Sequence, residues 1–497
     1  MPAPAPGAMT TPGTAVENPS GGTNEGTEAN LPLDGTPADP GASPTPVPPA
    51  GPPAPPVFGD ARTLLDASVK FYGAQRSGDG GNWLLSGGTC HMNDGESVQA
   101  DLTGGWYDAG DHVKVTLSIA YASYVMLKAY DAFPTAFDDL NDQRYTGAPN
   151  TVPDVLDEAR YATDYLVKAH LDDTTLVGMV GNANQDHRMW VGCAAQEALP
   201  PEQGGRPRPV STQANADVSG ITAASLAIMA RLYRPFDASL ADSYQTHAEL
   251  IYQIGKNNPM GSNPGLYGQQ GDDWIDEMLA GAAELYRLTQ DQTYLTDALD
   301  FNSRIENHGW APNYSQSADF SRHTLYVAGQ AEAVGEFWRL DVENYEAKVS
   351  TNEFTAGAVY FDEWGMLRYA AGAGFSAALY AQVTGDTAAR DLAISQLNYI
   401  AGQNSYSRSF VIGVGADTPQ NPHHRNSDTL GVLLTGALVA GPTQRARAFN
   451  GMMTEPGYAD VTEDYVGNEV ALDYNAGVVG LGAFGVLQQL PAGGQVQ

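Results

Sequence analysis

Cysteine and long apolar runs are both scarce in this sequence of 497 residues, and each shortage excludes a class of protein. The two cysteines, Cys90 and Cys193, allow one disulfide bond at most, so disulfides cannot be the main support of the fold. No apolar run is long enough to cross a bilayer, and we expect no membrane partner. Hydrophobic residues nevertheless make up 42% of the chain, which is ample for a large core.

Basic residues are also few, because 25 Lys and Arg stand against 58 Asp and Glu, a net charge of −33. A surface this negative repels phosphates and anionic lipids, so nucleic acid is not an expected partner. A neutral polymer such as a polysaccharide is compatible with it. The charge is also explained by the solubility of a secreted protein or by adaptation to salt, and the sequence leaves these interpretations open.

Aromatic residues are missing from the beginning of the chain, where none precedes Phe58. Residues 1–57 consist mainly of Pro, Gly, Thr, Ser and Ala. Such a segment cannot bury enough surface to offset its chain entropy, so we expect a flexible linker. No signal peptide is visible, because Met1 is followed by Pro-Ala-Pro rather than by a basic and then apolar stretch. We expect residues 58–490 to form one folded domain and residues 491–497 a short tail.

From Ala61 onward, apolar residues recur at helical spacing, with Gly-, Asn- and Pro-rich loops between them. Three joints between helices place an Asp where it can cap the next helix, at Asp237, Asp291 and Asp386. About eleven or twelve helices in such hairpins must bury their apolar stripes against one another, which predicts a large all-α fold. The stripes predict helices near 60–74, 113–132, 152–170, 220–234, 239–256, 274–288, 292–307, 323–340, 365–383, 387–401 and 475–489.

The first candidate site residues are Asp108 and Asp111, in the stretch Gly-Gly-Trp-Tyr-Asp-Ala-Gly-Asp-His that begins at Gly104. Small residues between two aspartates let the backbone turn tightly and bring both carboxylates to one place. Of two close carboxylates, one can hold a water while the other orients it. Asp-Gly clusters usually only mark turns, but the preceding Gly-Gly-Trp-Tyr and the helical run that follows favour a catalytic interpretation.

The second candidate stretch runs from Ser409 to Arg425 and ends in Pro-His-His-Arg. His423 and Arg425 carry hydrogen-bond donors that suit a ligand with many acceptor lone pairs. The adjacent histidines also suggest a metal site. We rank that alternative low, because no nearby Cys or carboxylate spacing completes a ligand shell.

The third candidate is Glu469, in the run from Tyr458 to Ala476. Aromatic and amide neighbours can keep a carboxyl protonated near neutral pH, as a group must be if it is to protonate a departing oxygen. Alone, this glutamate would be an ordinary residue at a helix start. Asp460, in the same run, is expected to position the loop.

These three stretches, in this order, resemble the signatures of glycoside hydrolase family 9, the inverting cellulases. The resemblance spans residues 58–490 and implies an (α/α)6 barrel, a toroid of helical hairpins with long loops around an open cleft. It makes Glu469 the general acid, Asp111 the general base and Asp108 the partner of the base. Linkers of the composition of residues 1–57 commonly tether secreted catalytic domains to carbohydrate-binding modules, although a solubilising tail explains the composition equally well.

Further residues follow from the same resemblance. It places His423 and Arg425 against sugar hydroxyls and Tyr474 at the point of cleavage. One position departs from the family pattern, because Asp417 stands where Asn, Lys or Arg is usual. Sugar rings pack their C–H faces on aromatic rings, so a glucan cleft should be lined with Trp and Tyr. The expected cleft residues are Trp364, Arg368, Tyr369, His187, Trp190, Trp310 and Tyr314.

The same resemblance bears on whether the protein holds a metal ion. Some family members hold zinc near the position of Cys90 and His91 with an earlier cysteine and the residue before the Asp-Ala-Gly-Asp motif. That residue is Tyr107 here and no earlier cysteine exists, so we do not expect zinc and expect Cys90 to be a small buried residue. A structural calcium ion near Asp217 is left open, because no complete ligand set can be matched.

The function implied is that of an endo-β-1,4-glucanase, secreted and monomeric, that cleaves internal bonds of cellulose or related β-glucans with inversion and needs no cofactor. The carboxyl groups of Asp111 and Glu469 should then lie roughly 6.5–9.5 Å apart, with room for a water. One alternative is an exo-acting β-glucosidase or β-glucosaminidase of the same family. The other is a non-catalytic glucan-binding module, which the presence of all three acidic residues argues against.

Overall fold

The computed structural model describes residues 60–85, 89–141, 147–262, 266–267, 273–305, 309–449 and 452–489. The linker expected over residues 1–57 and the tail expected over residues 491–497 lie outside the described residues. The longer helices are α1 (Ala61–Gln75), α2 (Thr116–Ala132), α3 (Asp154–Ala169), α6 (Ala216–Tyr233), α7 (Ala238–Asn257), α8 (Ile275–Thr289), α9 (Gln292–Arg304), α10 (Ala318–Leu325), α11 (Ala331–Ala347), α12 (Met366–Thr384), α13 (Thr387–Ile400) and α15 (Leu472–Gln489).

Short elements lie in the loops. The short helices are α4 (Ala183–Asp186), α5 (Cys193–Gln196) and α14 (Arg425–Leu430), and the single turns are η1 (Glu96–Val98), η2 (Pro134–Ala136), η3 (Pro201–Gln203) and η4 (Tyr326–Gln330). The strands are β1 (Lys114–Val115), β2 (His170–Asp172), β3 (Thr175–Leu176), β4 (Met179–Val180), β5 (Val210–Ser211), β6 (Arg447–Phe449) and β7 (Met452–Thr454). They pair antiparallel, in the order β1-β4-β5 and as the hairpins β2-β3 and β6-β7.

Within the described residues, six helices form a closed inner ring. α2 packs on α6, α6 on α8, α8 on α10, α10 on α12, α12 on α15, and α15 returns to α2. Four of them, α2, α6, α12 and α15, are apolar on nearly all sides, as expected of helices surrounded by protein. Glycine permits close approach within the ring, because a Cβ on Gly480 of α15 would lie 2.4 Å from the ring of Phe375 on α12.

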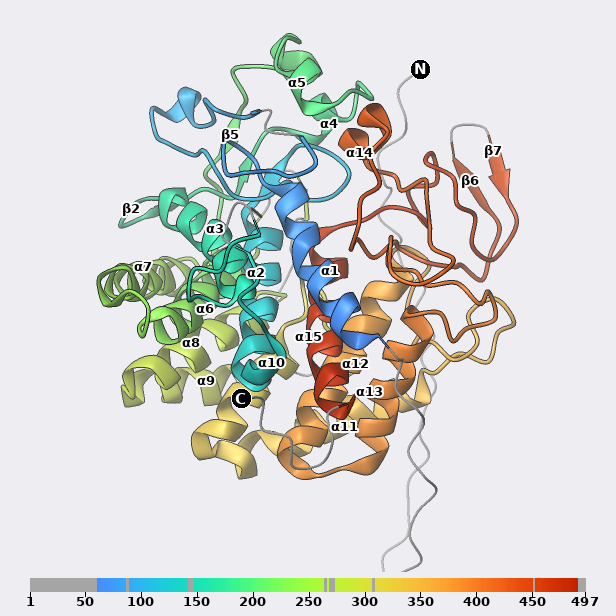
Figure 1. Ribbon diagram of the computed structural model, residues 1–497. Helices are drawn as coiled ribbons and strands as arrows, with labels where there is room; N and C mark the ends of the chain where they lie inside the picture. Colours follow the sequence, from blue (N-terminus) through green and yellow to red (C-terminus); the bar gives the residue numbers. More distant parts are fainter. Residues whose placement is uncertain are drawn as a thin grey trace, which may run out of the picture. The chain divides into compact units, whose positions relative to one another are not determined.

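A second layer of helices covers the ring. α1 packs on α15, α3 on α2, α7 on α6 and α9 on α8, while α11 and α13 both pack on α12. These helices bury one stripe and expose the other side; in α7, for example, Tyr244, Ala248 and Ile251 are buried. The inner and outer layers together are the predicted (α/α)6 barrel, and Figure 1 shows helices of both layers.

Local signals account for most of the helix boundaries. Asp237, Asp291 and Asp386 each accept a backbone N–H in the first turn of α7, α9 and α13, so the predicted caps are confirmed. The single helix predicted over residues 323–340 is wrong, because α10, η4 and α11 divide this stretch. Gly329 in η4 has φ = +87°, which an α-helix does not tolerate.

The long loops gather at one end of the barrel, at the top of Figure 1, where α4, α5, α14 and the β6-β7 hairpin lie. In these loops Cys90 and Cys193 form a disulfide, with their Cα atoms 6.0 Å apart. The expectation that Cys90 is merely a small buried residue was therefore incomplete, because the two cysteines are 103 residues apart in sequence and the spacing does not show that they meet. None of the described helices has the length and apolarity needed to cross a membrane.

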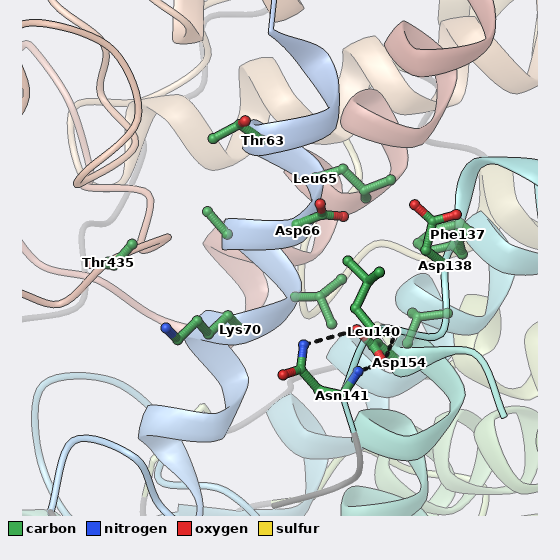
Figure 2. Close-up of a pocket in the computed structure, with 13 residues that line it drawn as sticks. Thr63, Leu65, Asp66, Lys70, Phe137, Asp138, Leu140, Asn141, Asp154 and Thr435 are labelled. Atoms are coloured by element: carbon green, nitrogen blue, oxygen red, sulfur yellow. Dashed lines mark hydrogen bonds between the residues drawn. The ribbon is translucent and has the colours of Figure 1, made fainter. Parts of the chain in front are cut away.

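A pocket of about 250 Å³ lies on the outer surface, where residues 137–141 cross between α1 and α3 (Figure 2). Asp66, Asp138 and Asp154 line it. Burial, opposed by the charge of Arg62 and aided by the two neighbouring carboxylates, raises the pKa of Asp66 to about 6. The pocket contains none of the candidate site residues.

Candidate active site

Backbone hydrogen bonds hold the three candidate stretches together. The donors and acceptors are Leu472 N and Asp108 O at 3.0 Å, Arg425 N and Gly110 O at 2.9 Å, and His423 N and Asn468 O at 2.8 Å. Glycine is required at position 110, because a Cβ there would lie 2.0 Å from the carbonyl oxygen of His423. Stretches more than 300 residues apart in sequence thus meet at a fixed geometry.

Asp108 is buried behind this junction. Its carboxylate accepts hydrogen bonds from the hydroxyl of Ser118 on α2 and from the hydroxyl of Tyr267, the latter at 2.7 Å. Burial and the nearby charge of Asp111 raise the pKa of Asp108 to about 7, although the two hydrogen bonds act to lower it. The two carboxyl groups are therefore close enough that a negative charge on Asp111 disfavours ionisation of Asp108.

Asp111 lies nearer the surface and contacts His187, with Asp111 Oδ2 and His187 Nε2 separated by 2.7 Å. A carboxylate can only accept, so the imidazole N–H is the donor. Burial lowers the pKa of His187, but the hydrogen bond to Asp111 and the charge of Asp111 together leave it above its ordinary value. The structure thus places His187 against the carboxylate of Asp111.

Glu469 is partly buried in the same junction. Its Oε2 lies 3.4 Å from the indole Nε1 of Trp364. Burial, with smaller contributions from the charges of Asp111 and Asp108, raises the pKa of Glu469 to about 8. A glutamate in this setting holds its proton at neutral pH, while two further carboxyl groups lie close enough to influence it.

Arg425 is buried beneath the junction rather than on its surface. One guanidinium nitrogen lies 2.5 Å from Asp186 Oδ1, and the other Asp186 oxygen accepts from Gln196 at 2.6 Å. Asp186 immediately precedes His187, so Arg425 anchors the segment that contacts Asp111. This burial favours a supporting role for Arg425 over the predicted direct contact with a sugar hydroxyl, because its head group is covered.

Aromatic side chains form a row that ends at Trp364, the neighbour of Glu469. The ring centroids of Trp190 and His423 are 4.6 Å apart, those of His423 and Tyr465 5.9 Å, and those of Tyr465 and Trp364 5.3 Å. Trp190 and Trp364 remain 40% and 46% exposed. Large indole faces left open in a row can pack against sugar rings.

A second group of rings surrounds Arg368. Its guanidinium lies 3.3 Å from Asp473, 2.7 Å from the hydroxyl of Tyr369, and over the rings of Tyr314 and Tyr474 at 5.4 Å each. Trp310, 46% exposed, packs edge-on against Tyr369 at 5.8 Å. The structure therefore gathers Tyr474, Tyr369, Tyr314 and Trp310 into one group, in which Tyr369 and Tyr474 are buried. Their expected contact with substrate stays a prediction.

Several residues of the site were missed from the sequence. Tyr267 bonds Asp108 and packs on Tyr314 with ring centroids 4.4 Å apart, yet it lies in a Gly-rich loop with no distinguishing pattern. Asp186 directly precedes His187 and was passed over. Tyr465 and Asp473 lie within the run from Tyr458 to Ala476, and their closeness to Glu469 in sequence is the signal that could have identified them as site residues.

At the two positions considered for a metal ion, Cys90 and Asp217, the side chains are bonded within the protein. The sulfur of Cys90 is bonded to Cys193, so it is not a free thiolate for zinc. Asp217 uses both oxygens on the backbone N–H and hydroxyl of Ser262. Among the described residues it belongs to no group of three converging His, Cys, Asp or Glu ligands, and a calcium ion near it stays a prediction.

One group of potential metal ligands does converge in the described part of the chain, and it is Asp111, Asp186 and His187. Their ligand atoms lie within 4.8 Å of one another. The carboxylate of Asp186 is already neutralised by Arg425 and that of Asp111 is bonded to His187. These contacts describe an ion-pair network rather than a metal shell.

Comparison with known proteins places these observations in context. The chain matches the model of glycosyl hydrolase family 9 over residues 62–482. It is 32% identical over 458 residues to endoglucanase A of Bacillus pumilus, covering 84% of this chain and 65% of that protein. It is 33% identical over 393 residues to endoglucanase A of Fibrobacter succinogenes, covering 72% of this chain and 84% of that protein.

Solved structures agree with this match. The crystal structure of the cellulase Cel9M of C. cellulolyticum is 29% identical, with a TM-score of 0.74, and the match covers 87% of this chain and 99% of that one. The endoglucanase CelQ from Clostridium thermocellum, complexed with cellotetraose, is 27% identical with a TM-score of 0.70, covering 85% of this chain and 70% of that one. The chain spans just under two thirds of the length of the Bacillus pumilus relative.

Proposed function

The chain belongs to glycosyl hydrolase family 9, and from this premise we propose that it is an endo-β-1,4-glucanase that cleaves internal bonds of cellulose or related β-glucans with inversion. The observation that carries the proposal is the position of Glu469, a carboxyl with a pKa of about 8, beside the two carboxyl groups of Asp108 and Asp111. One protonated acid facing a second carboxylate is the requirement for inverting glycoside hydrolysis.

In the proposed reaction, Glu469 transfers its proton to the glycosidic oxygen as the bond from that oxygen to the anomeric carbon breaks. Asp111 removes a proton from a water whose oxygen forms a new bond to the same carbon from the opposite face. The sugar leaves with inverted configuration, and Asp111 then releases its proton to solvent while Glu469 takes one up, which restores the starting state. His187 holds Asp111 in place through the 2.7 Å hydrogen bond, and the nearby charge of Asp111 raises the pKa of Asp108.

The substrate class is supported by the exposed aromatic rings of the site. Trp190, Trp364 and Trp310 offer flat apolar faces to a chain of neutral pyranose rings. His423 lies between Trp190 and Tyr465, where its exposed atoms can bond hydroxyl groups. The net charge of −33 is compatible with an uncharged polymer.

Internal cutting is favoured over the exo-acting alternative, because the relatives that the chain matches are named endoglucanases. We also propose that the protein acts outside the cell, as a monomer and without a required cofactor. Size-exclusion chromatography with light scattering tests the monomer, and activity in the presence of a chelator tests the independence from metal.

The main experiment measures the viscosity of carboxymethylcellulose and the release of reducing ends together. Internal cutting predicts a rapid fall in viscosity for few new ends. Glu469→Gln and Asp111→Asn should each lose most turnover, while the matched control Glu463→Gln, an exposed residue of the same loop, should not. Near-normal turnover of Asp111→Asn on a natural glucan would refute the assignment of the base.

A further inference from the structure

A pocket of about 240 Å³ lies beside the Trp190 end of the aromatic row. It is formed by the loop at residues 420–422, by Ser427, Asp428 and residues 431–433 at the end of α14, and by Thr462. Asp460 holds the 420–422 loop, because its carboxylate accepts the backbone N–H groups of Gln420 at 2.8 Å and Asn421 at 2.9 Å. The wall of the pocket is therefore fixed by bonds within the protein.

The pocket is joined directly to the cleft by two contacts. Asp428, which lines it, accepts a hydrogen bond from Trp190 Nε1 at 2.5 Å. The carbonyl oxygen of Thr462, which also lines it, lies 2.6 Å from His423 Nδ1. Since Trp190 and His423 pack on each other, a chain that rests on Trp190 passes the mouth of this pocket.

The lining has the mixed chemistry of a sugar site. Val432 and Leu433 are 38% and 37% exposed and offer apolar surface. The side chains of Gln420 and Asn421 supply amide groups, and Asp428 supplies a carboxylate. No lysine or arginine lines the pocket, so a phosphate or another anion is not the expected ligand. Apolar faces interleaved with amides and hydroxyls suit a neutral pyranose.

The size of the pocket limits the ligand. A volume of 240 Å³ equals the share of about eight water molecules in the liquid. That is enough for one sugar ring and too little for a second chain. A linear glucan lying over Trp190 carries only hydroxyl and hydroxymethyl groups, none of which is large enough to fill it.

We propose that this pocket binds a single-sugar branch carried by the backbone of a β-1,4-glucan, and so extends the substrate class to branched β-glucans. The inference rests on the proposed function, because the backbone must lie in the cleft. The branch enters between the apolar surface of Val432 and the amides of residues 420–421, and the backbone ring that bears it packs on Trp190.

The test compares cellohexaose, which is linear, with a xyloglucan oligosaccharide of the same backbone length. Val432→Trp fills the pocket, and Leu430→Trp is the matched control, because Leu430, at the end of α14 and two residues before Val432, is 50% exposed but does not line the pocket. We expect Val432→Trp to lower kcat/KM on the branched substrate about tenfold and to leave kcat/KM on cellohexaose unchanged. Leu430→Trp should change neither value, and thermal unfolding should show both variants folded.

Three results would overturn the inference. Equal losses on both substrates would make the pocket part of the backbone site, and no loss on the branched substrate would show that no branch enters it. A wild-type protein that cleaves cellohexaose but not the branched oligosaccharide would exclude a single-sugar branch as the ligand of the pocket. Inactivity of the wild type on both substrates would instead refute the proposed function itself, and this inference with it, so the two failures are distinguishable.

Discussion

Replacing Glu469 by Gln should abolish most activity and at the same time make the protein more stable at alkaline pH. At pH 7, a carboxyl with a pKa of about 8 is about 90% protonated, whereas one with the ordinary value of 4.5 is protonated only about 0.3% of the time. The site thus raises the amount of acid available for catalysis about 300-fold. Glutamine cannot transfer a proton, and kcat should fall about 1,000-fold.

The stability follows from the same pKa. A carboxyl whose pKa is higher in the folded than in the unfolded state favours folding below pH 4.5, and that contribution is lost as the pH rises to about 8. The full difference corresponds to roughly 5 kcal/mol, and partial exposure of the side chain reduces the expected effect to about 2 kcal/mol. Glutamine carries no charge at any of these pH values, so the variant should gain this amount near pH 9 and nothing near pH 4.

The assay combines denaturant unfolding at pH 4 and pH 9 with the pH profile of kcat/KM on cellohexaose. The wild-type rate should decline on the alkaline side near pH 8, where Glu469 loses its proton. Glu463→Gln, which removes an exposed carboxyl from the same loop, controls for the loss of one negative charge. A Glu469→Gln variant that is destabilised at pH 9, or that keeps its rate, would refute the reasoning.

Other residues give independent tests. Asp66→Asn in the surface pocket of Figure 2 should stabilise the protein by about 1 kcal/mol above pH 7, because this partly exposed carboxyl has a pKa raised to about 6. The gain should vanish at pH 4, and a gain that persists there would show that the raised pKa is not its cause. Tyr267→Phe removes a hydrogen bond that lowers the pKa of Asp108. We therefore expect kcat to fall about tenfold with little change in KM, and the pH optimum to move. An unchanged pH profile would argue against a link between this hydrogen bond and the ionisation of Asp108. Asp386→Ala should cost about 1 kcal/mol in the free energy of unfolding and leave kcat unchanged, since it removes only the cap of α13, whereas Asp386→Asn should retain most of the stability.

The site could be anticipated only where its residues lie within a recognisable stretch of sequence. Asp108, Asp111 and Glu469 each stand in such a stretch, and the structure brings all three into electrostatic contact. Tyr267 and Asp186 could not be anticipated in the same way, because each acts through one side-chain contact to a residue distant in sequence. The placement of Arg425 against Asp186 likewise depends on a separation of 239 residues.

The sequence by itself determined the helices, their caps and the three acidic residues, because helical periodicity and capping involve residues no more than four positions apart. It also carried the glycines that leave space where segments meet, such as Gly110. Only the tertiary structure decided that α15 closes the ring onto α2, that Cys90 meets Cys193, and that Glu469 keeps its proton at neutral pH. Those properties depend on burial and on charges supplied by segments hundreds of residues apart, which no local pattern records.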